Sequence, residues 1–391
     1  MKIAIYQQHA NGVVGGAEYV VAVMAEALSR DHTVDIIHHQ PELTSEALQA
    51  AYGTDVSRVG LRYVAPDRSV SSWTNPVRRY RRERARYAQA GSGYDLYIAS
   101  VFDVPPFCPA PRGALSIYFP YFDKRVTWPW EQNGASLKRK LQRLYAEWEW
   151  RRRFGGYQVA MSCSAFSRDY LRQWWGVESE VVYAPASVEA RDDGASMKRD
   201  VILSVGRFAS GGTSKNQLEL VTAFAGFGPQ QAPGWTYKIV GGLSNKPGDQ
   251  AYFAQVGNAA NGASTELLAN VSRDRLTALY AEAKIFWHGA GLTAPDDPLL
   301  MEHFGIVTVE AMSAGCVPVV ISRGGQPEIV EHGKSGFLWT TLEEMTQHTA
   351  RLTSDPELLA RMSAAARKRA ETFSKAAFVR RMNDALRPLL Q

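Results

Sequence analysis

The chain of 391 residues has few cysteines and no long apolar run. Its three cysteines, Cys108, Cys163 and Cys316, are widely separated and form no Cys-x-x-Cys pair, which argues against a disulfide framework or a zinc site. No apolar stretch approaches the roughly 20 residues of a membrane-spanning helix. Residues 1–6 have the character of a strand rather than the layout of a signal peptide. These absences predict a cytoplasmic protein.

The composition is that of a globular protein, with 45% hydrophobic and 21% charged residues. A chain of this length favours two domains. Strand-like apolar runs alternate with helical patterns through both halves, which predicts an α/β fold of two doubly wound parallel-sheet domains. The strand-like runs are 2–7, 33–38, 95–99, 114–118, 158–162, 181–184, 201–205, 237–240, 285–288 and 317–321. Helical patterns include 17–29, 217–224, 273–282, 307–314 and 375–391.

The polar, non-periodic segment 185–200 is interpreted as the linker between the domains. We therefore expect an N-terminal domain over 1–190, a C-terminal domain over 191–373, and a last helix over 374–391 that packs back on the first domain. Ligands of open α/β sheets bind at the carboxyl ends of the strands, so two facing sheets would place a binding cleft near the linker.

Two carboxylates, Glu302 and Glu310, bracket the start of an apolar segment. A buried unpaired carboxylate costs several kcal/mol to desolvate, so we expect ligand hydroxyls to satisfy both. If the stretch is largely helical, eight residues at about 1.5 Å each separate the two by roughly 12 Å. That separation is wider than the roughly 5–9.5 Å of glycosidase acid/base pairs. It favours the binding of two ends of one extended polar ligand.

Two cations are candidates for a diphosphate site. Arg207 follows the strand-like run 201–205, and Lys215 precedes the next helical pattern. An arginine fork and a lysine point charge suit a diphosphate and would stabilise the charge that develops on it as a leaving group. Taken singly, each is more commonly an ordinary surface cation.

The first βα loop, 11–18, contains Gly15 and Gly16 followed by Glu18. Glycines allow close approach of the backbone to a ligand, and a helix N-terminus favours phosphate. The spacing is not that of a dinucleotide fingerprint, and a tight turn is the alternative. Glu18 taken alone is interpreted as a first-turn carboxylate that complements the helix dipole.

Other motifs are weaker. Gly333-Lys334-Ser335 lacks the first glycine of a P-loop and is interpreted as a surface turn. No Ser-His-Asp spacing, His-Glu-x-x-His or Asp-x-Asp element occurs, and Asp296-Asp297 is interpreted as solvated. We expect neither a metal nor a cofactor.

Basic residues gather in two segments, 78–86 and 138–153, the second interleaved with Tyr145, Trp148 and Trp150. They are solvated helix faces in one interpretation and a site for an anionic partner, a membrane surface or an acidic acceptor, in the other. Nucleic acid is not expected, because no recognition motif accompanies the charge.

In combination, the Gly15-Gly16 loop, Arg207 with Lys215, the Glu302-x7-Glu310 element and segment 324–330 resemble the retaining glycosyltransferases of family 4. The resemblance covers most of the chain and is strongest over 201–338. It implies the GT-B architecture, in which two Rossmann-like domains face each other across a cleft.

The resemblance also implies roles for individual residues. Arg207 and Lys215 would bind the donor diphosphate, Glu302 would accept hydrogen bonds from the donor sugar, and Glu310 would hold the ribose. The remaining donor-side positions are Gly15 and Gly16 at the phosphate, the backbone of His303, Phe304, Gly305 and Ile306 at the sugar and phosphate, and Val271 at the nucleobase.

The first half departs from the pattern of the family. Many relatives have a histidine after the fourth strand that contacts donor sugar or acceptor, and here Tyr118 occupies that position. We place Tyr118 and Glu18 on the acceptor side. The loop 289–301 is longer than is usual in the family.

The sequence thus predicts a retaining, metal-independent hexosyltransferase that uses a nucleotide-diphosphate sugar and a hydroxyl acceptor, in glycan, glycolipid or glycoside biosynthesis. A lipid-linked or anionic acceptor and peripheral membrane contact follow from the basic segments. Two alternatives keep the fold: a nucleotide-sugar epimerase and a non-catalytic sugar-nucleotide-binding protein. A nicotinamide-dependent oxidoreductase is disfavoured by the glycine spacing.

Overall fold

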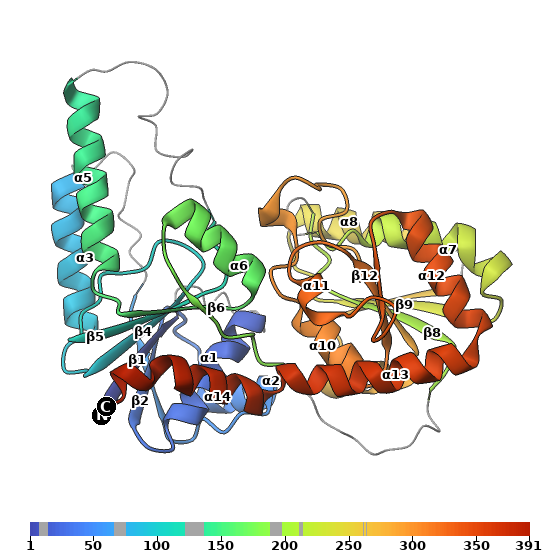
Figure 1. Cartoon of the computed structure of the whole chain (residues 1–391), viewed down its shortest axis with the longest axis horizontal. Coiled ribbons are helices and arrows are strands. Elements are labelled where there is room, and N and C mark those ends of the chain that lie inside the picture. The colour runs from blue at the N-terminus through green and yellow to red at the C-terminus, as the bar shows by residue number, and fades with distance from the viewer. Residues whose placement is uncertain are drawn as a thin grey trace. The chain divides into compact units, whose positions relative to one another are not determined.

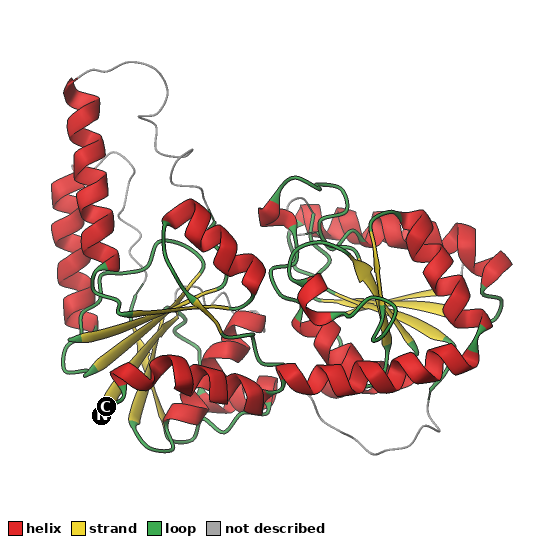
Figure 2. Cartoon of the chain, viewed as in Figure 1, coloured by secondary structure: helices red, strands yellow, loops and turns green. Residues whose placement is uncertain are grey.

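The structure is a computed structural model that describes residues 1–7, 15–65, 76–121, 137–187, 198–210, 214–260, 262 and 264–391. It comprises two compact units, one formed by Met1–Ala184 with Phe378–Gln391 and the other by Pro185–Ala377. Each unit is built on its own parallel sheet with helices on both faces (Figures 1 and 2).

The first unit has a seven-stranded sheet of order β3-β2-β1-β4-β5-β6-β7, in which all the neighbouring strands are parallel. Its strands are β1 (Lys2–Gln7), β2 (Thr33–His38), β3 (Val59–Tyr63), β4 (Leu96–Val101), β5 (Arg112–Ile117), β6 (Val159–Ser162) and β7 (Glu180–Val181). Its helices are α1 (Gly16–Leu28), α2 (Ser45–Tyr52), α3 (Pro76–Ala90), α5 (Leu137–Phe154) and α6 (Ala165–Tyr170), which continues as a π-helix over Leu171–Trp175. Helix α14 (Lys375–Leu386) and the 3₁₀ turn Arg387–Leu389 end the chain, and Arg112 Nη1 donates to the Leu389 carbonyl at 2.7 Å.

The second unit has a six-stranded parallel sheet of order β10-β9-β8-β11-β12-β13. Its strands are β8 (Val201–Val205), β9 (Thr236–Gly241), β10 (Thr265–Ala269), β11 (Ile285–His288), β12 (Val317–Ile321) and β13 (Phe337–Trp339). Its helices are α7 (Gln217–Gln231), α8 (Pro247–Ala259), α9 (Arg273–Glu282), α10 (Ile306–Ser313), α11 (Gln326–Ile329), α12 (Leu342–Ser354) and α13 (Pro356–Ala370), with 3₁₀ turns at Pro298–Leu300 and Glu371–Phe373.

The central strands are buried on both faces. Every residue of β4, β8, β11 and β12 is buried, as expected for parallel strands that are covered by helices on each side. In the second unit, Trp287, Tyr237, Phe224 and Trp339 are fully buried in one core. The predicted α/β fold of two doubly wound parallel-sheet domains is therefore confirmed.

The sequence interpretation of the site was wrong in one respect. The stretch that follows Glu302 is not largely helical, because α10 begins only at Ile306. Gly305 precedes it with φ 120°, and a Cβ there would lie 2.7 Å from Gln326 Nε2, so this turn requires glycine. Glu302 therefore lies in a loop, and the helical estimate of its distance from Glu310 does not apply.

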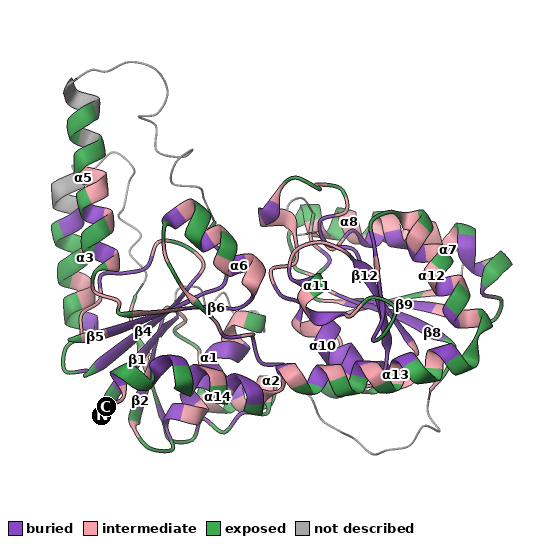
Figure 3. Cartoon of the chain, viewed as in Figure 1, coloured by how far each residue is buried: buried purple, intermediate pink, exposed green. Residues whose placement is uncertain are grey.

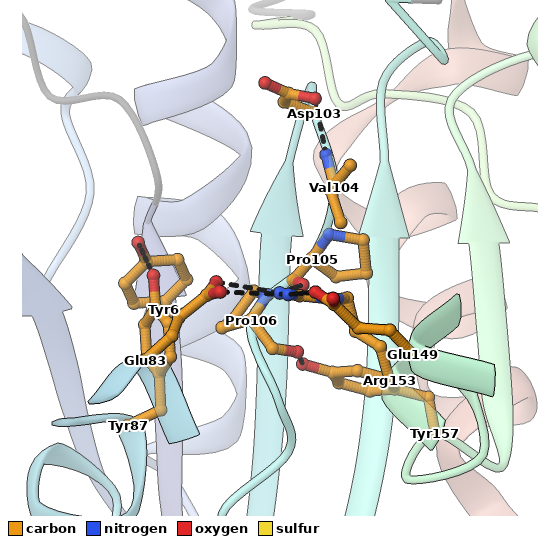
Figure 4. A network of polar contacts seen from close by, with 10 residues as sticks. All are labelled: Tyr6, Glu83, Tyr87, Asp103, Val104, Pro105, Pro106, Glu149, Arg153 and Tyr157. Atoms are coloured by element: carbon orange, nitrogen blue, oxygen red, sulfur yellow. Dashed lines mark hydrogen bonds and ion pairs between the residues drawn. The ribbon is translucent and has the colours of Figure 1, made fainter. Parts of the chain in front are cut away.

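Helices α3 and α5 of the first unit lie side by side and extend beyond the sheet (Figure 1). Buried Arg153 of α5 joins them at the sheet end: it donates to Glu83 of α3 at 2.8 and 3.0 Å, to Glu149 at 2.9 Å and to the Pro105 carbonyl at 2.8 Å (Figure 4). Burial lowers the pKa of Arg153, but Glu83 and Glu149 outweigh that effect and raise it, so the guanidinium stays charged.

None of the helices within the described residues is long and apolar enough to cross a membrane.

Candidate functional site

Three side chains meet at the carboxyl ends of β8 and β11. Lys215 Nζ donates to Glu302 Oε2 at 2.9 Å, and His288 Nε2 lies 3.1 Å from the same oxygen. His288 is the last residue of β11 and is buried, whereas Lys215 and Glu302 retain 27% and 20% of their side-chain exposure. The cluster therefore has a buried histidine on one side, while its lysine and glutamate remain accessible to solvent.

The charge state of Glu302 follows from these partners. Burial would raise the pKa of Glu302, but the charge of Lys215 and the hydrogen bond from His288 outweigh it and hold the pKa well below its usual range. The carboxylate is ionised near neutral pH and accepts hydrogen bonds only. It can therefore receive hydrogen bonds from hydroxyls on its exposed side.

Glycines shape the backbone around this cluster. A Cβ on Gly206 would lie 2.6 Å from Lys215 Cγ, so a glycine is needed for the lysine stem to pass. A Cβ on Gly324 would lie 2.1 Å from the Glu302 carbonyl oxygen, which accepts a 2.8 Å hydrogen bond from Gly325 N. The Gly324-Gly325 pair thus fixes the backbone that carries Glu302.

Arg207 lies just beyond β8 and its side chain is exposed. Its carbonyl accepts from Gln217 Nε2 at 3.0 Å, which ties the loop after β8 to the start of α7. Lys215 immediately precedes Asn216, the N-cap of that helix. Both predicted cations thus come from the segment between β8 and α7.

Glu310 lies inside α10 and is buried. Arg273 Nη2 donates to its Oε1 at 2.7 Å, and the Tyr280 hydroxyl donates to its Oε2 at 3.2 Å. Burial and the Glu310 charge raise the pKa of Tyr280 well above its usual value, so the phenol remains a donor. Each carboxylate oxygen keeps a further lone pair for a hydroxyl.

The segment between the two carboxylates approaches the helix start. The His303 ring lies 3.2 Å from the Pro298 carbonyl, and burial lowers the pKa of His303 to about 4, so the ring is neutral. Phe304 is buried against Phe373. Ile306 opens α10, where the first backbone N–H groups lack intrahelical partners.

Val271 is half-buried and follows Asn270, whose φ is 54°. The Asn270 side chain accepts from Leu243 N at 2.8 Å and donates to the Leu243 carbonyl at 3.1 Å. Ser272 then caps α9 by accepting from Arg275 N. Val271 is thus held two residues before the arginine that bonds to Glu310.

Four predicted site residues belong to the first unit. Gly15 N bonds to the Tyr52 hydroxyl at 3.1 Å, and Gly16 and Glu18 lie in the first turn of α1. The Tyr118 hydroxyl bonds to Ser100 Oγ at 2.7 Å and to the Ala17 carbonyl at 3.0 Å, and the ring is buried. Residues 8–14, which include the start of the glycine loop, lie outside the described part of the chain.

The long loop 289–301 is held from two sides. Arg323 Nη1 donates to the carbonyls of Gly291 at 2.6 Å and Leu292 at 3.2 Å. Asn216 Nδ2 donates to Thr293 Oγ1 at 2.9 Å. Asp297 caps the 3₁₀ turn by accepting from Leu299 N at 3.0 Å.

Sequence reasoning missed His288, Arg273 and Tyr280. The sequence pattern places His288 at the end of a strand and the other two residues within a helix, without a role for any of them. A titratable residue at the carboxyl end of a buried strand was the available signal for His288. Nothing in the sequence pairs Arg273 or Tyr280 with a carboxylate 37 and 30 positions away.

Residues 188–369 match the family model described as glycosyl transferases group 1. The matched segment covers nearly all of the second unit and is similar there to that family. The first unit lies outside the match.

Curated relatives share parts of the chain. The chain is 26% identical over 238 residues to the GDP-Man:Man(3)GlcNAc(2)-PP-Dol alpha-1,2-mannosyltransferase of Dictyostelium discoideum, covering 57% of this chain and 45% of that protein. It is 40% identical over 80 residues to the D-inositol 3-phosphate glycosyltransferase of Streptomyces scabiei, covering 19% of this chain and 18% of the relative. The matched regions thus span less than half of either relative.

Solved structures share the fold along the whole chain. A glycosyltransferase from Rickettsia africae superimposes with a TM-score of 0.70 at 15% identity, covering 100% of this chain and 98% of that one. The Anabaena protein HepE in complex with UDP-glucose gives 0.69 at 17% identity, covering 99% and 100%. These likenesses establish the GT-B fold.

Proposed function

We propose that the protein is a retaining, metal-independent hexosyltransferase of family 4 that transfers a sugar from a nucleotide-diphosphate donor to an acceptor hydroxyl. The observation that carries the proposal is the cluster of Lys215, Glu302 and His288 at the carboxyl ends of β8 and β11. A cation and an ionised carboxylate side by side match a ligand in which a phosphate adjoins a hydroxyl-rich ring.

In this proposal Lys215 leaves Glu302 for the donor diphosphate, and Arg207 joins it there. Two cations would neutralise the charge that grows on the diphosphate as the bond between sugar and phosphate breaks. Glu302, still supported by His288, would accept hydrogen bonds from the sugar hydroxyls. The acceptor hydroxyl would attack the anomeric carbon from the face that the diphosphate leaves, which retains the configuration.

The nucleoside part of the donor would extend toward Glu310. Its carboxylate, oriented by Arg273 and Tyr280, would accept the ribose hydroxyls, and Val271 would lie against the base. The N–H groups at the start of α10 would meet a phosphate oxygen, because a helix N-terminus favours an anion. Gly15 and Gly16 would approach the phosphate from the first unit, and Glu18 and Tyr118 would lie on the acceptor side.

We further propose a cytoplasmic enzyme with a lipid-linked or anionic acceptor. The name of the Dictyostelium relative includes a dolichol-diphosphate acceptor and a GDP-mannose donor, which makes GDP-mannose the first donor to test. The concentration of basic residues in α3 and α5 supports an anionic partner.

The deciding experiment combines binding with product analysis. A thermal-shift screen of nucleoside diphosphates and their sugars identifies the donor, since a ligand held only by the folded state raises the melting temperature. Transfer to a panel of lipid-linked and soluble acceptors then gives a product whose anomeric configuration is read by NMR. Retention supports the proposal, and inversion or sugar conversion without an acceptor contradicts it.

A further inference from the structure

Helix α5 presents a row of large hydrophobic side chains to solvent. Leu141, Leu144 and Trp148 are 59%, 62% and 47% exposed. Their spacing of three and four residues places them on one face of the helix. Isolated exposed leucines are ordinary, but three large apolar side chains in line on one helix form a patch that calls for a partner.

The same helix pair carries a strong positive charge. The sequences of α3 and α5 together hold 13 lysines and arginines and three glutamates. Two of those glutamates, Glu83 and Glu149, bond to buried Arg153, and Glu147 pairs with Arg143 at 2.9 Å. The sequence of the helix pair therefore carries a strong excess of positive charge.

Described cations flank the row on its own helix. Lys140, Arg151 and Arg152 are exposed there, and Figure 3 shows exposed positions along much of α5. At about 100° per residue, Lys140 and Arg151 project on one side of the line through Leu141 and Leu144, and Arg152 lies along it. Cations beside leucines and a tryptophan are the pattern of a helix that lies in a membrane interface.

The Trp148 end of the row packs against α3. The Trp148 ring packs on Tyr80 of α3 with centroids 5.0 Å apart, and Arg152 Nε donates to the Tyr80 hydroxyl at 3.3 Å. Trp150 faces inward, 5.5 Å from Trp175, so the two tryptophans of α5 have different roles. Below them, Arg153 locks both helices to the loop after β4.

We propose that the α5 face formed by Leu141, Leu144 and Trp148, with its flanking cations, binds the surface of an anionic lipid bilayer. The leucines enter the acyl boundary, the tryptophan takes the interfacial position that its ring favours, and the cations contact lipid phosphates. Nucleic acid is disfavoured as the occupant, because exposed leucines gain nothing from a phosphate backbone. The inference stands on the surface chemistry alone and goes beyond the proposed activity.

The test is flotation of the full chain with phosphatidylcholine vesicles, with and without one-third phosphatidylglycerol. We expect flotation with the anionic vesicles, weakening as salt is added. Leu141→Ser with Leu144→Ser should reduce the bound fraction by about tenfold at fixed lipid, and Lys140→Glu with Arg151→Glu should reduce it similarly. Matched controls are Tyr63→Ser, another exposed large hydrophobic side chain, and Lys334→Glu, another exposed cation.

The proposal is overturned by no flotation of the wild type with anionic vesicles, by equal flotation of the face variants and the controls, or by conversion of a dimer to a monomer by the two serine substitutions. Retention of RNA without vesicle binding would also overturn it and assign the face to nucleic acid. Nucleoside diphosphate binding, measured on the same variants by thermal shift, separates this result from the proposed activity. Loss of flotation with donor binding intact concerns the α5 face alone.

Discussion

Lys215 and Glu302 form an ion pair, in which the ammonium lies 2.9 Å from the carboxylate although the two residues are 87 positions apart in the sequence. The pair is partly buried and His288 supports its acidic member. Such a pair is poised to exchange partners, because a diphosphate offers the lysine a stronger anion and sugar hydroxyls offer the carboxylate new donors.

Substitution of Lys215 by Met should lower turnover by about 100-fold or more, because a positioned charge at a developing anion contributes a few kcal/mol. Unfolding should become easier by only about 1–3 kcal/mol, the cost of a partly buried carboxylate that loses one partner. Steady-state kinetics and urea denaturation measure the two effects. Lys246→Met, at an exposed lysine of the same unit, is the control. Normal turnover of the Lys215 variant with every donor that binds would refute the diphosphate role.

Removal of Arg273 should raise KM for the donor by roughly tenfold with little change in kcat, since Glu310 loses the group that orients it. Arg275→Met, on the same turn of α9 and exposed, should leave KM unchanged. Equal KM values for Arg273→Met and the control would show that the contact with Arg273 serves the fold only.

His303 should make stability fall as the solution is acidified from pH 7 to pH 5. Burial lowers its pKa from 6.5 to about 4, so in this range the unfolded chain binds a proton that the folded chain does not. The free energy of unfolding therefore rises with pH, and acidification from pH 7 to pH 5 lowers it by about 2 kcal/mol. Glu302 reduces the free energy of unfolding only below about pH 4.5, because its pKa is lowered in the folded protein and its protonation destabilises the fold only in more acidic solution. Denaturation of His303→Gln at both pH values should show a correspondingly flatter dependence, and parallel curves would contradict the assignment.

Arg153→Met should destabilise the protein by roughly 3–5 kcal/mol, because two carboxylates then remain near the α3–α5 junction without their cation. Arg143→Met removes a largely exposed pair with Glu147 and should cost no more than about 0.5 kcal/mol. Chemical denaturation compares them. Similar losses for the two variants would mean that the buried network does not hold the helix pair.

A chelator should leave transfer unchanged if Arg207 and Lys215 neutralise the diphosphate. The measurement is turnover after dialysis against EDTA, with and without added magnesium or manganese. A loss of activity that either metal restores would replace the proposed cationic mechanism with a metal-assisted one.

The strands with continuous apolar sequence were predictable, whereas three edge strands were missed and the fourth, β7, overlaps the predicted run 181–184 by one residue. Segment 201–205 was assigned as a strand and matches β8. β3 and β10 were missed because most of their residues are only partly buried or exposed. β13 was missed because it has only three residues. Edge strands lack the two-sided burial that makes a parallel strand visible as a Val/Ile run.

The site residues were predictable as types and not as contacts. Glu302 and Lys215 were both chosen for their chemistry, but their pairing depends on the strand order β8-β11, which no local pattern encodes. The helical estimate for Glu302 failed because Gly305, with its positive φ, delays the helix until Ile306. Roles that depend on a bound donor remain predictions.

Asn216 joins the segment that carries Lys215 to the loop that precedes Glu302. Its backbone is left-handed, with φ 56°, its amide donates to Thr293, and its side-chain oxygen accepts from Leu292 N at 3.3 Å. A glycine could adopt the same backbone and lose only these two attachments. The residue next to Lys215 is thus hydrogen-bonded to the loop that leads to Glu302, which gives the two charged side chains a shared anchor outside their own ion pair.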